Sequence, residues 1–379
     1  MTWRCLRHIL IQKGINGLSK TQGMDMIDNK LYKEDVQYVA GLDLPWEKLE
    51  GKSFLITGAS GLMGTFLIDV LMCRNLSNDM RCRVYAVGRN VKKAESLFAA
   101  YMGSEFFRFI SHDINQPFDQ EGIGTVEYVL HMASNTHPVA YATDPIGTVT
   151  ANIIGTNNML SFAAEHGAKR FAFSSSNEIY GENRGDTELF DEHYCGYIDS
   201  NTMRAGYPES KRCGEALCQA YLKQKHLDVV IPRFTRSYGP TMLMTDTKAI
   251  SQFIRKGIAG KDIVLKSAGT QYYSYTYVAD AVSGLLTVIL KGETGEAYNI
   301  ADEASDITLR DLAAIIAAKA GTKVVFELPD ELEKSGYSTA TKARLDGSKI
   351  KKLGWTPRYD IRSGMYRNMD ILKEINAHG

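Results

Sequence analysis

A tyrosine and a lysine lie four residues apart in the segment YPESK, as Tyr207 and Lys211. Residues at this spacing share one face of an α-helix, and Pro208 is typical of a first helical turn, which places Tyr207 at the helix entrance. A free tyrosine titrates near pH ~10, whereas an ammonium group about 4 Å away favours tyrosinate by up to about 4 kcal/mol at an effective dielectric of about 20. The pair therefore predicts a general base for work near neutral pH, and a chance spacing on an ordinary helix is the alternative. The helix after Pro208 is expected to bury an apolar stripe of Cys213, Leu217, Ala220 and Tyr221.

A glycine-rich segment, TGASGLMG, joins a predicted strand to a predicted helix. Its three glycines suit, in turn, a tight turn, a close approach of the backbone to a pyrophosphate, and close packing of helix against strand. The helix N-terminus then offers amide donors and a partial positive charge to the phosphates. This context predicts a dinucleotide site whose contacts include Gly58, Ser60, Gly61, Leu62, Met63 and Gly64.

The end of the second predicted strand bears on which dinucleotide binds. An acidic residue there would bind the ribose hydroxyls of NAD, but the segment AVGRN places Gly88 and Arg89 near this position. An arginine accommodates the 2′-phosphate of NADP, and the alternative is a solvated Arg89 beside the adenine. Asp113, after the third predicted strand, is expected to contact the adenine in either case.

Strand-like runs alternate with helical patterns over the first part of the chain. Strands are predicted at residues 52–57, 83–87, 106–110, 126–133, 170–176 and 228–234, and the clearest helix, at 152–167, ends at Gly167. This alternation predicts an α/β fold with a Rossmann-type, doubly wound parallel sheet. After Tyr238 the pattern becomes irregular, with helices predicted at 248–259 and 308–320, which indicates a smaller, mixed C-terminal substrate lobe.

The pattern predicts three segments. Residues 1–50 form an N-terminal extension and lead-in, residues 51–236 the NAD(P)-binding Rossmann domain, and residues 237–379 mainly the substrate-binding lobe, with part of 270–302 returning to the Rossmann domain. Residues 1–24 carry five basic side chains, counting His8, and no acid. They predict either an amphipathic targeting peptide or an extension upstream of a start at Met24 or Met26, and we favour the second.

The composition excludes several classes of partner. The 379 residues contain 44 lysines and arginines against 44 aspartates and glutamates, so no bulk charge argues for nucleic acid or an anionic membrane. No apolar run is long enough to span a bilayer. The six cysteines are scattered, without a metal-like or disulfide-dense pattern, so we expect no metal and a reducing cytoplasm.

Seven short motifs follow one another along the chain. They are the glycine loop, HMA at His131, NIIGTNNML from Asn152, SSSNEIYG from Ser174, YPESK, SYGP from Ser237 and LGWTP from Leu353. Together they resemble the extended short-chain dehydrogenase/reductase family, in its nucleotide-sugar epimerase/dehydratase branch, from about residue 51 to about residue 370. The resemblance implies an NAD-dependent enzyme that transiently oxidises a nucleotide sugar at C4 and then epimerises, decarboxylates or dehydrates it.

The resemblance also assigns roles to single residues. Tyr207 corresponds to the catalytic base, and Lys211 to its partner, which also holds the nicotinamide ribose. Ser176 corresponds to the hydroxyl that hydrogen-bonds the reacting oxygen, with Ser175 as the alternative if the strand register differs by one. Ala133, in the HMA motif, is an implied cofactor contact. NAD is favoured over NADP because a hydride that returns to the same sugar needs no reducing pool.

The residues after Ser176 bear on the outcome of the reaction. Sugar 4,6-dehydratases of the family carry Asp-Glu there and UDP-glucuronate decarboxylases carry Ser-Glu, whereas this chain has Asn177 and Glu178. Glu178 is expected to be a base beside the sugar ring, and a carboxylate paired at the cleft edge is the alternative. Asn177 is an expected substrate contact without an ionisable proton. A UDP-glucuronate decarboxylase-like or 4-epimerase-like reaction is therefore favoured over a dTDP- or CDP-sugar 4,6-dehydratase.

Two positions depart from the family pattern. Arg236 stands where the family has an asparagine before xYGP, and Tyr273 stands where it has an arginine that grips the substrate pyrophosphate. Arg236 is expected to replace that contact from the other side of the cleft, and a different nucleotide or orientation is the alternative. The lost arginine belongs to the pattern of UDP-glucuronate decarboxylases, so it counts against that identity.

Two further functions remain as alternatives. One is a net NADP-linked reductase, supported by Arg89, and the other is a non-catalytic dinucleotide-sensing protein, which the presence of Ser176, Tyr207 and Lys211 disfavours. The expected partner is a nucleotide-sugar substrate, with no nucleic acid and no membrane. The resemblance implies a homodimer through a four-helix interface, formed by the helix at residues 153–164 and the one after Tyr207.

Overall fold

The protein is described by a computed structural model that covers residues 26–119, 122–136, 141, 143–243, 245–327 and 341–378. Residues 1–24, for which the sequence left two interpretations, lie outside the described residues. Within the described part of the chain, no helix is both long enough and apolar enough to cross a membrane.

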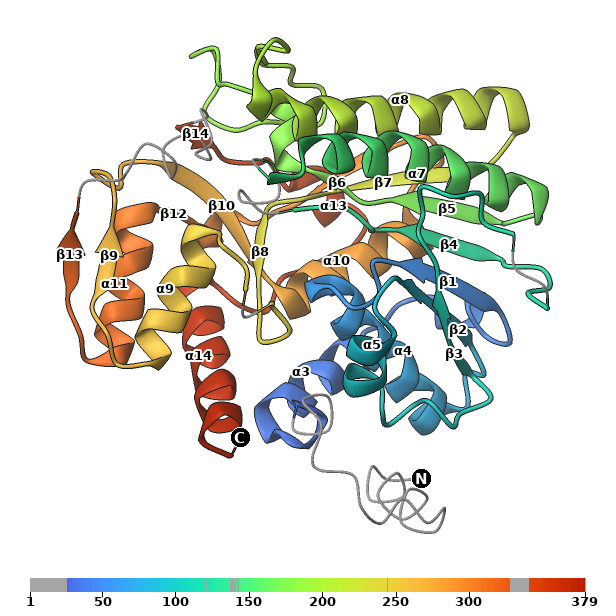
Figure 1. Cartoon of the computed structure of the whole chain (residues 1–379), viewed down its shortest axis with the longest axis horizontal. Helices are drawn as coiled ribbons and strands as arrows, with labels where there is room; N and C mark the ends of the chain where they lie inside the picture. Colours follow the sequence, from blue (N-terminus) through green and yellow to red (C-terminus); the bar gives the residue numbers. More distant parts are fainter. Residues whose placement is uncertain are drawn as a thin grey trace.

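A parallel sheet of eight strands carries the fold, in the order β11-β7-β5-β4-β1-β2-β3, with β6 paired to β7 (Figure 1). Its predicted strands are present with small changes at the ends, and the expected strand at 170–176 is divided in two at Ser174. The strands are β1 Ser53–Thr57, β2 Arg83–Gly88, β3 Phe107–Ser111, β4 Tyr128–His131, β5 Arg170–Phe173, β6 Ser175–Ser176, β7 Val229–Phe234 and β11 Ala297–Ile300. The doubly wound, Rossmann-type sheet predicted from the sequence is confirmed.

Helices cover both faces of this sheet because successive side chains of a buried strand point to opposite faces. Phe54 and Ile56 of β1 pack with the helices of one face, and Leu55 between them packs with those of the other. The first face carries α3 Lys30–Ala40, α4 Leu62–Asn78, α5 Val91–Leu97 and α10 Val278–Lys291. The second carries α7 Pro145–Glu165, which starts seven residues before the predicted helix, and α8 Gly206–Lys225.

A smaller lobe lies beside the carboxyl ends of the main strands (Figure 1). It contains a four-stranded sheet, β12-β10-β14 with β8 paired to β10, and a two-stranded sheet, β13-β9. The strands are β8 Arg236–Tyr238, β9 Ile263–Leu265, β10 Tyr272–Tyr277, β12 Asp306–Thr308, β13 Val324–Phe326 and β14 Lys342–Ala343. The helices are α9 Ala249–Ile258, α11 Leu309–Ala320, α13 Ser348–Lys351 and α14 Ile361–His378. The limits of the three predicted segments stay a prediction.

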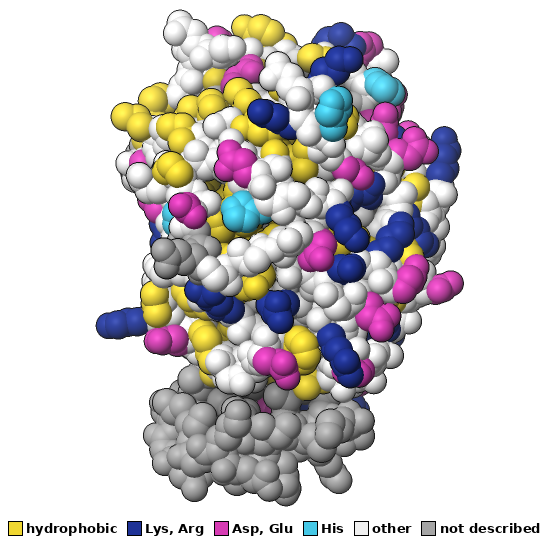
Figure 2. All heavy atoms as spheres, turned by 90° about the vertical axis from the view of Figure 1, so that its right-hand side faces the viewer, with side chains coloured by type: hydrophobic (Ala, Val, Ile, Leu, Met, Phe, Trp, Pro, Cys, Tyr) yellow, Lys and Arg dark blue, Asp and Glu magenta, His cyan; other side chains and the backbone are white. Residues whose placement is uncertain are grey.

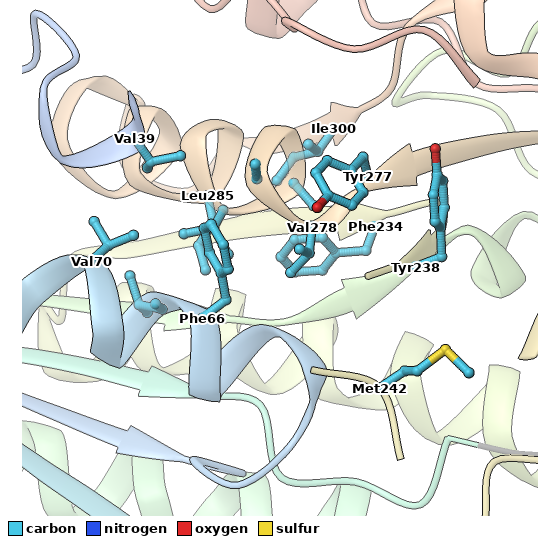
Figure 3. Close-up of a cluster of buried hydrophobic side chains, with 14 of the residues drawn as sticks. Val39, Phe66, Val70, Phe234, Tyr238, Met242, Tyr277, Val278, Leu285 and Ile300 are labelled. Atoms are coloured by element: carbon cyan, nitrogen blue, oxygen red, sulfur yellow. The ribbon is translucent and has the colours of Figure 1, made fainter. Parts of the chain in front are cut away.

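Short 3₁₀ turns complete the described elements. They are η1 Trp46–Lys48, η2 Asn177–Tyr180, η3 Met203–Ala205 and η4 Glu303–Ser305. Two of them, η2 and η3, flank the segment that precedes α8. The main sheet and the small lobe share one apolar core, in which Val39 of α3, Phe66 of α4 and Leu285 of α10 lie with Tyr277 of β10 (Figure 3).

Helix α3 joins the two ends of the chain through a buried carboxylate. Asp35, which is fully buried, accepts hydrogen bonds from the Tyr277 hydroxyl at 2.8 Å and the Tyr359 hydroxyl at 2.6 Å. It also accepts one from Nε of Arg367, in α14, at 2.6 Å. Burial is the larger influence and raises the pKa of Asp35, while these three donors lower it. The lead-in segment of the sequence is thus an integral part of the core.

Candidate active site

The glycine loop between β1 and α4 has the shape of a phosphate cradle. Gly58 has φ +69°, and a Cβ there would lie 2.8 Å from backbone atoms of Met132 and Ala133. A Cβ on Gly64 would lie 2.6 Å from the carbonyl oxygen of Ala59. Only glycine fits both places, which lets β1, β4 and α4 meet closely. Helix α4 begins one residue after Gly61, which provides no side-chain cap, so its first amides point out of the loop.

Thr57 fixes the predicted HMA motif against this loop. Its Oγ1 accepts hydrogen bonds from the backbone amides of Met132 and Ala133, both at 3.1 Å, and lies 2.8 Å from Nδ1 of His131. Burial, and then the charge of Lys211, lowers the pKa of His131 to about 3. The imidazole is therefore neutral and can accept from the Thr57 hydroxyl, which in turn holds the Ala133 amide beside the loop.

A cavity beside the loop contains a cation that sequence reasoning missed. Lys93 of α5 donates a hydrogen bond from Nζ to the carbonyl oxygen of Ser60 at 2.6 Å, and both residues line a cavity beside the loop. Arg89 is exposed immediately after β2, and Asp113 lies half-buried after β3. All these positions lie at the carboxyl ends of parallel strands, where α/β sheets bind ligands.

Helix α8 presents Tyr207 and Lys211 on its buried face. This face runs from Tyr207 through Lys211 and Gly214 to Cys218, at helical spacing. The predicted apolar stripe is therefore wrong as the buried face, since Cys213, Leu217 and Tyr221 are only half-buried. Helix α8 approaches β5 so closely that a Cβ on Gly214 would lie 2.3 Å from the ring of Phe173. This close approach carries the polar pair into the protein interior.

The protonation of the pair differs from the sequence-based prediction. Burial, followed by the charge of Glu178, raises the pKa of Tyr207, while the hydrogen bond with Ser176 and the charge of Arg204 lower it. Lys211 has its Nζ 6.0 Å from the centre of the Tyr207 ring and donates to the Ser174 carbonyl oxygen at 2.8 Å. Burial lowers the pKa of Lys211 to about 7. The predicted lowering of the tyrosine pKa by the lysine is wrong here, because desolvation outweighs a charge at this distance.

Ser176 is the serine that meets Tyr207, through their hydrogen bond. It lies in β6 and also accepts the amide of Glu178 at 3.2 Å, which starts the η2 turn. The alternative, Ser175, is buried with no hydrogen-bond partner for its hydroxyl. Asn177 is buried beside Ser176 at the start of η2. After the break at Ser174, Ser176 therefore lies toward Tyr207, whereas the Ser175 hydroxyl is buried without a partner.

Glu178 forms an ion pair with Arg204, a residue that sequence reasoning missed. Nη2 of Arg204, in η3, lies 2.7 Å from both carboxylate oxygens of Glu178. The guanidinium also lies over the ring of Tyr141 at 4.8 Å, and Tyr141 stacks on Tyr207 at 5.0 Å. A signal was present in the sequence, since Arg204 stands three residues before Tyr207, but Tyr141 gave none.

Arg236 and Tyr273, the two departures from the family pattern, lie against each other. Strands β8 and β10 pair in parallel, and the Arg236 guanidinium lies over the Tyr273 ring at 3.5 Å from its centre. Nη1 of Arg236 is buried without a hydrogen-bond partner. Burial raises the pKa of Tyr273, Arg236 lowers it, and the charge of Glu178 raises it further. The exchange therefore places a guanidinium with a free donor over the position where the family arginine stands.

The family follows from comparison with known proteins. A model of the NAD dependent epimerase/dehydratase family matches residues 54–301, which include the loop, Ser176, Tyr207 and Lys211. The chain belongs to this family. The resemblance inferred from the motifs is confirmed, the protein is an NAD-dependent epimerase/dehydratase, and the cradle around Gly58 fits a dinucleotide.

This epimerase/dehydratase is similar to proteins of several named activities. It is 31% identical over 318 residues to UDP-glucuronic acid decarboxylase 6 of Arabidopsis thaliana, covering 82% of this chain and 86% of the relative. It is 28% identical over 335 residues to UDP-glucuronic acid decarboxylase 1 of Danio rerio, covering 86% and 74%. Its fold resembles dTDP-glucose 4,6-dehydratase of Streptomyces venezuelae with a TM-score of 0.72, at 22% identity and 85% and 97% coverage. UDP-glucuronic acid 4-epimerase of Bacillus cereus gives a TM-score of 0.70, at 22% identity and 85% and 99% coverage.

Replacing Tyr207 by phenylalanine tests its role as the base. We expect Tyr207→Phe to bind NAD as the wild type does, in a calorimetric titration, and to lose at least ~10²-fold in turnover, the scale of a lost general base. Tyr197→Phe changes an exposed tyrosine and is the control, with unchanged turnover. Wild-type turnover in Tyr207→Phe would contradict the assignment.

Proposed function

We propose that this epimerase/dehydratase is a UDP-glucuronate decarboxylase. The observation that carries the proposal is the set of groups beside Tyr207: a carboxylate at Glu178, and an amide at Asn177 where a dehydratase acid would stand. Similarity to UDP-glucuronic acid decarboxylases over most of the chain supports the same choice. A 4,6-dehydratase would need a proton donor for the departing hydroxyl, which Asn177 does not supply.

The residues described above have separate roles in the oxidation of the sugar at C4. When bound, NAD supplies an oxidised nicotinamide that takes the hydride from C4 of the sugar. Tyr207 accepts the proton of the C4 hydroxyl while Ser176 hydrogen-bonds the same oxygen. Lys211 is expected to hold the nicotinamide ribose, on the family resemblance, and the Ser174 carbonyl fixes its side chain. The sugar product of this step is a 4-keto hexuronate.

Loss of carbon dioxide follows from that product. The carboxylate at C6 is then β to the C4 ketone, so the electron pair of the C5–C6 bond moves toward the ketone oxygen as carbon dioxide leaves. A proton is added at C5, and C4 regains its hydride, which leaves a pentose. We assign the proton transfers that follow oxidation to Glu178, whose charge acts on Tyr207 and whose amide donates to Ser176.

The nucleotide is assigned to the side of the cleft formed by β8 and β10. Arg236 is half-buried, its Nη1 is buried without a hydrogen-bond partner, and its stacking on Tyr273 fixes the plane of the guanidinium. A planar guanidinium matches phosphate oxygens well. Arg236 therefore takes over the pyrophosphate contact of the missing arginine.

A panel of UDP-, dTDP-, CDP- and GDP-sugars, analysed by mass spectrometry, tests the proposal. We expect UDP-glucuronate to lose the mass of carbon dioxide without net consumption of NAD. Loss of water from a dTDP- or CDP-hexose would instead support a dehydratase, and an unchanged mass with altered retention would support an epimerase. Stoichiometric NADPH consumption would support a reductase, and absence of any turnover a dinucleotide sensor.

Two variants separate substrate binding from chemistry. A charge-assisted contact contributes about 1.5–3 kcal/mol, so Arg236→Ala should raise KM roughly ten- to a hundredfold. Glu178→Gln should still bind and oxidise the sugar, then stall with the absorbance of reduced nicotinamide. Arg344→Ala is the matched control, because that guanidinium lies over the neighbouring Tyr272 at 4.6 Å. Normal turnover in Glu178→Gln together with abolished oxidation in Arg236→Ala would reverse both roles.

A homodimer through α7 and α8 belongs to the same proposal. Three apolar side chains are exposed on and beside these helices: Ile146 at 78%, Ile154 at 46% and Met203 at 66%. Two such helix pairs meeting face to face would cover them. On the face in Figure 2, acidic and basic side chains are interspersed, as the balanced composition leads one to expect.

Replacing Ile154 by arginine tests this interface. We expect the wild type to have the mass of a dimer by light scattering and Ile154→Arg that of a monomer, because a charge opposes burial. Val91→Arg, at a side chain 43% exposed on α5, is the control and should leave the dimer intact. A monomeric wild type would refute the interface.

We also assign the protein to the cytoplasm, which fits the free cysteines among the described residues.

A further inference from the structure

Arg204 stands between the two reactive parts of the site. Its ion pair with Glu178 is largely shielded from water, with side chains 16% and 21% exposed. On its other side the guanidinium lies over Tyr141, which stacks on Tyr207 with an angle of 28° between the rings. Arg204 therefore touches the carboxylate directly and reaches the catalytic tyrosine through one aromatic ring.

The charged and titratable groups around Tyr207 come from every element packed on it. They are Glu178 of η2, Arg204 of η3, Tyr141 and Lys211 of α8. Tyr273 of β10 and Arg236 of β8 lie one step further out, where Tyr273 is influenced by Glu178 and Arg204, and Asp246 acts on Tyr141. Among the described residues, the ion pair that includes Glu178 is the one with Arg204. A negative charge on Tyr207 thus has one close carboxylate against it, and one guanidinium that cancels the carboxylate.

We propose that Arg204 is a positioning residue that holds the Glu178 carboxylate in place and neutralises its charge beside Tyr207. The inference rests on the proposed function only in so far as Tyr207 must be ionised before sugar oxidation, in which it accepts the proton of the C4 hydroxyl. Glu178 can then stay ionised for later proton transfers without opposing the first one. The two acid–base steps of the reaction are kept from interfering by a single guanidinium.

The electrostatic directions agree with this role. The charge of Glu178 raises the pKa of Tyr207 and the charge of Arg204 lowers it, both secondary to burial. Burial is the largest single influence on Arg204 and lowers its pKa, but the charge and hydrogen bond of Glu178 together with Tyr141 and Tyr207 outweigh it, so the pKa is raised. Removing one partner of a buried ion pair leaves the other uncompensated. Without Arg204, the unpaired charge of Glu178 would therefore raise the pKa of Tyr207 further.

The pH dependence of sugar oxidation tests the proposal. The rate is measured in a single turnover with UDP-glucuronate and NAD-loaded protein, through the absorbance of reduced nicotinamide. In Arg204→Met we expect the midpoint of the rising limb to move up by about one pH unit, because the tyrosine must now ionise against an unpaired carboxylate. That shift makes oxidation about tenfold slower at a pH below both midpoints.

A double variant tests whether the shift in the midpoint depends on the charge of Glu178. In Arg204→Met with Glu178→Gln the opposing charge is gone as well, so the midpoint should return to within a few tenths of the wild-type value. A merely structural Arg204 would give no such rescue. Arg204→Lys keeps the charge and should move the midpoint by less than Arg204→Met does, and circular dichroism confirms that each variant is folded.

Arg212→Met is the matched control. Arg212 holds the same segment through carbonyls, donating from Nε to Ile179 at 2.7 Å and from Nη2 to Gly196 at 3.0 Å, and its ion pair is with Glu209, at 3.5 Å, rather than with Glu178. Its removal should leave the midpoint unchanged. An unchanged midpoint in Arg204→Met, or no rescue in the double variant, overturns the inference. Failure of wild-type protein to oxidise any sugar would instead overturn the proposed function, so the two failures are distinct.

Discussion

The hydrogen bond from Lys211 to the carbonyl oxygen of Ser174 is the contact around which the site is arranged. An ammonium group buried without a partner costs several kcal/mol, and the sheet would normally occupy every carbonyl of a central strand. The break between β5 and β6 releases the Ser174 carbonyl from strand pairing and leaves it to Lys211. The break in this strand therefore gives the buried lysine a hydrogen-bond partner that offsets part of its desolvation cost. The same break places Ser176 beside Tyr207.

Burial then sets the chemistry of the remaining groups. Burial raises the pKa of Tyr207 and lowers the pKa of Lys211, because each side chain prefers its neutral form away from water. Charges inside this shielded space act more strongly than they would in water. A carboxylate at Glu178 consequently needs a guanidinium at contact distance, and Arg204 provides it. The site works with paired charges rather than with a single activated residue.

Local patterns in the sequence predicted the sheet, the glycine loop and the Tyr207–Lys211 spacing, because each depends on neighbours within a few residues. The apolar stripe expected on α8 is not its buried face, because the burial of Lys211 depends on a hydrogen-bond partner that helical periodicity does not reveal. The direction of the Tyr207 pKa was wrong for a related reason: spacing reveals a nearby charge but not the loss of water. Arg204 stands three residues before Tyr207, but its contacts with Glu178 and Tyr141 form only in the tertiary fold, so the sequence did not reveal them.

The carboxylate of Asp35 has a consequence for the order of assembly. Its partners Tyr359 and Arg367 lie 324 and 332 residues further along the chain. A ribosome adds about 5–20 residues per second, so α3 emerges well before the residues that complete its contacts. Until α14 is released, Asp35 of α3 lacks the donors Tyr359 and Arg367, so α3 makes these contacts only late in synthesis.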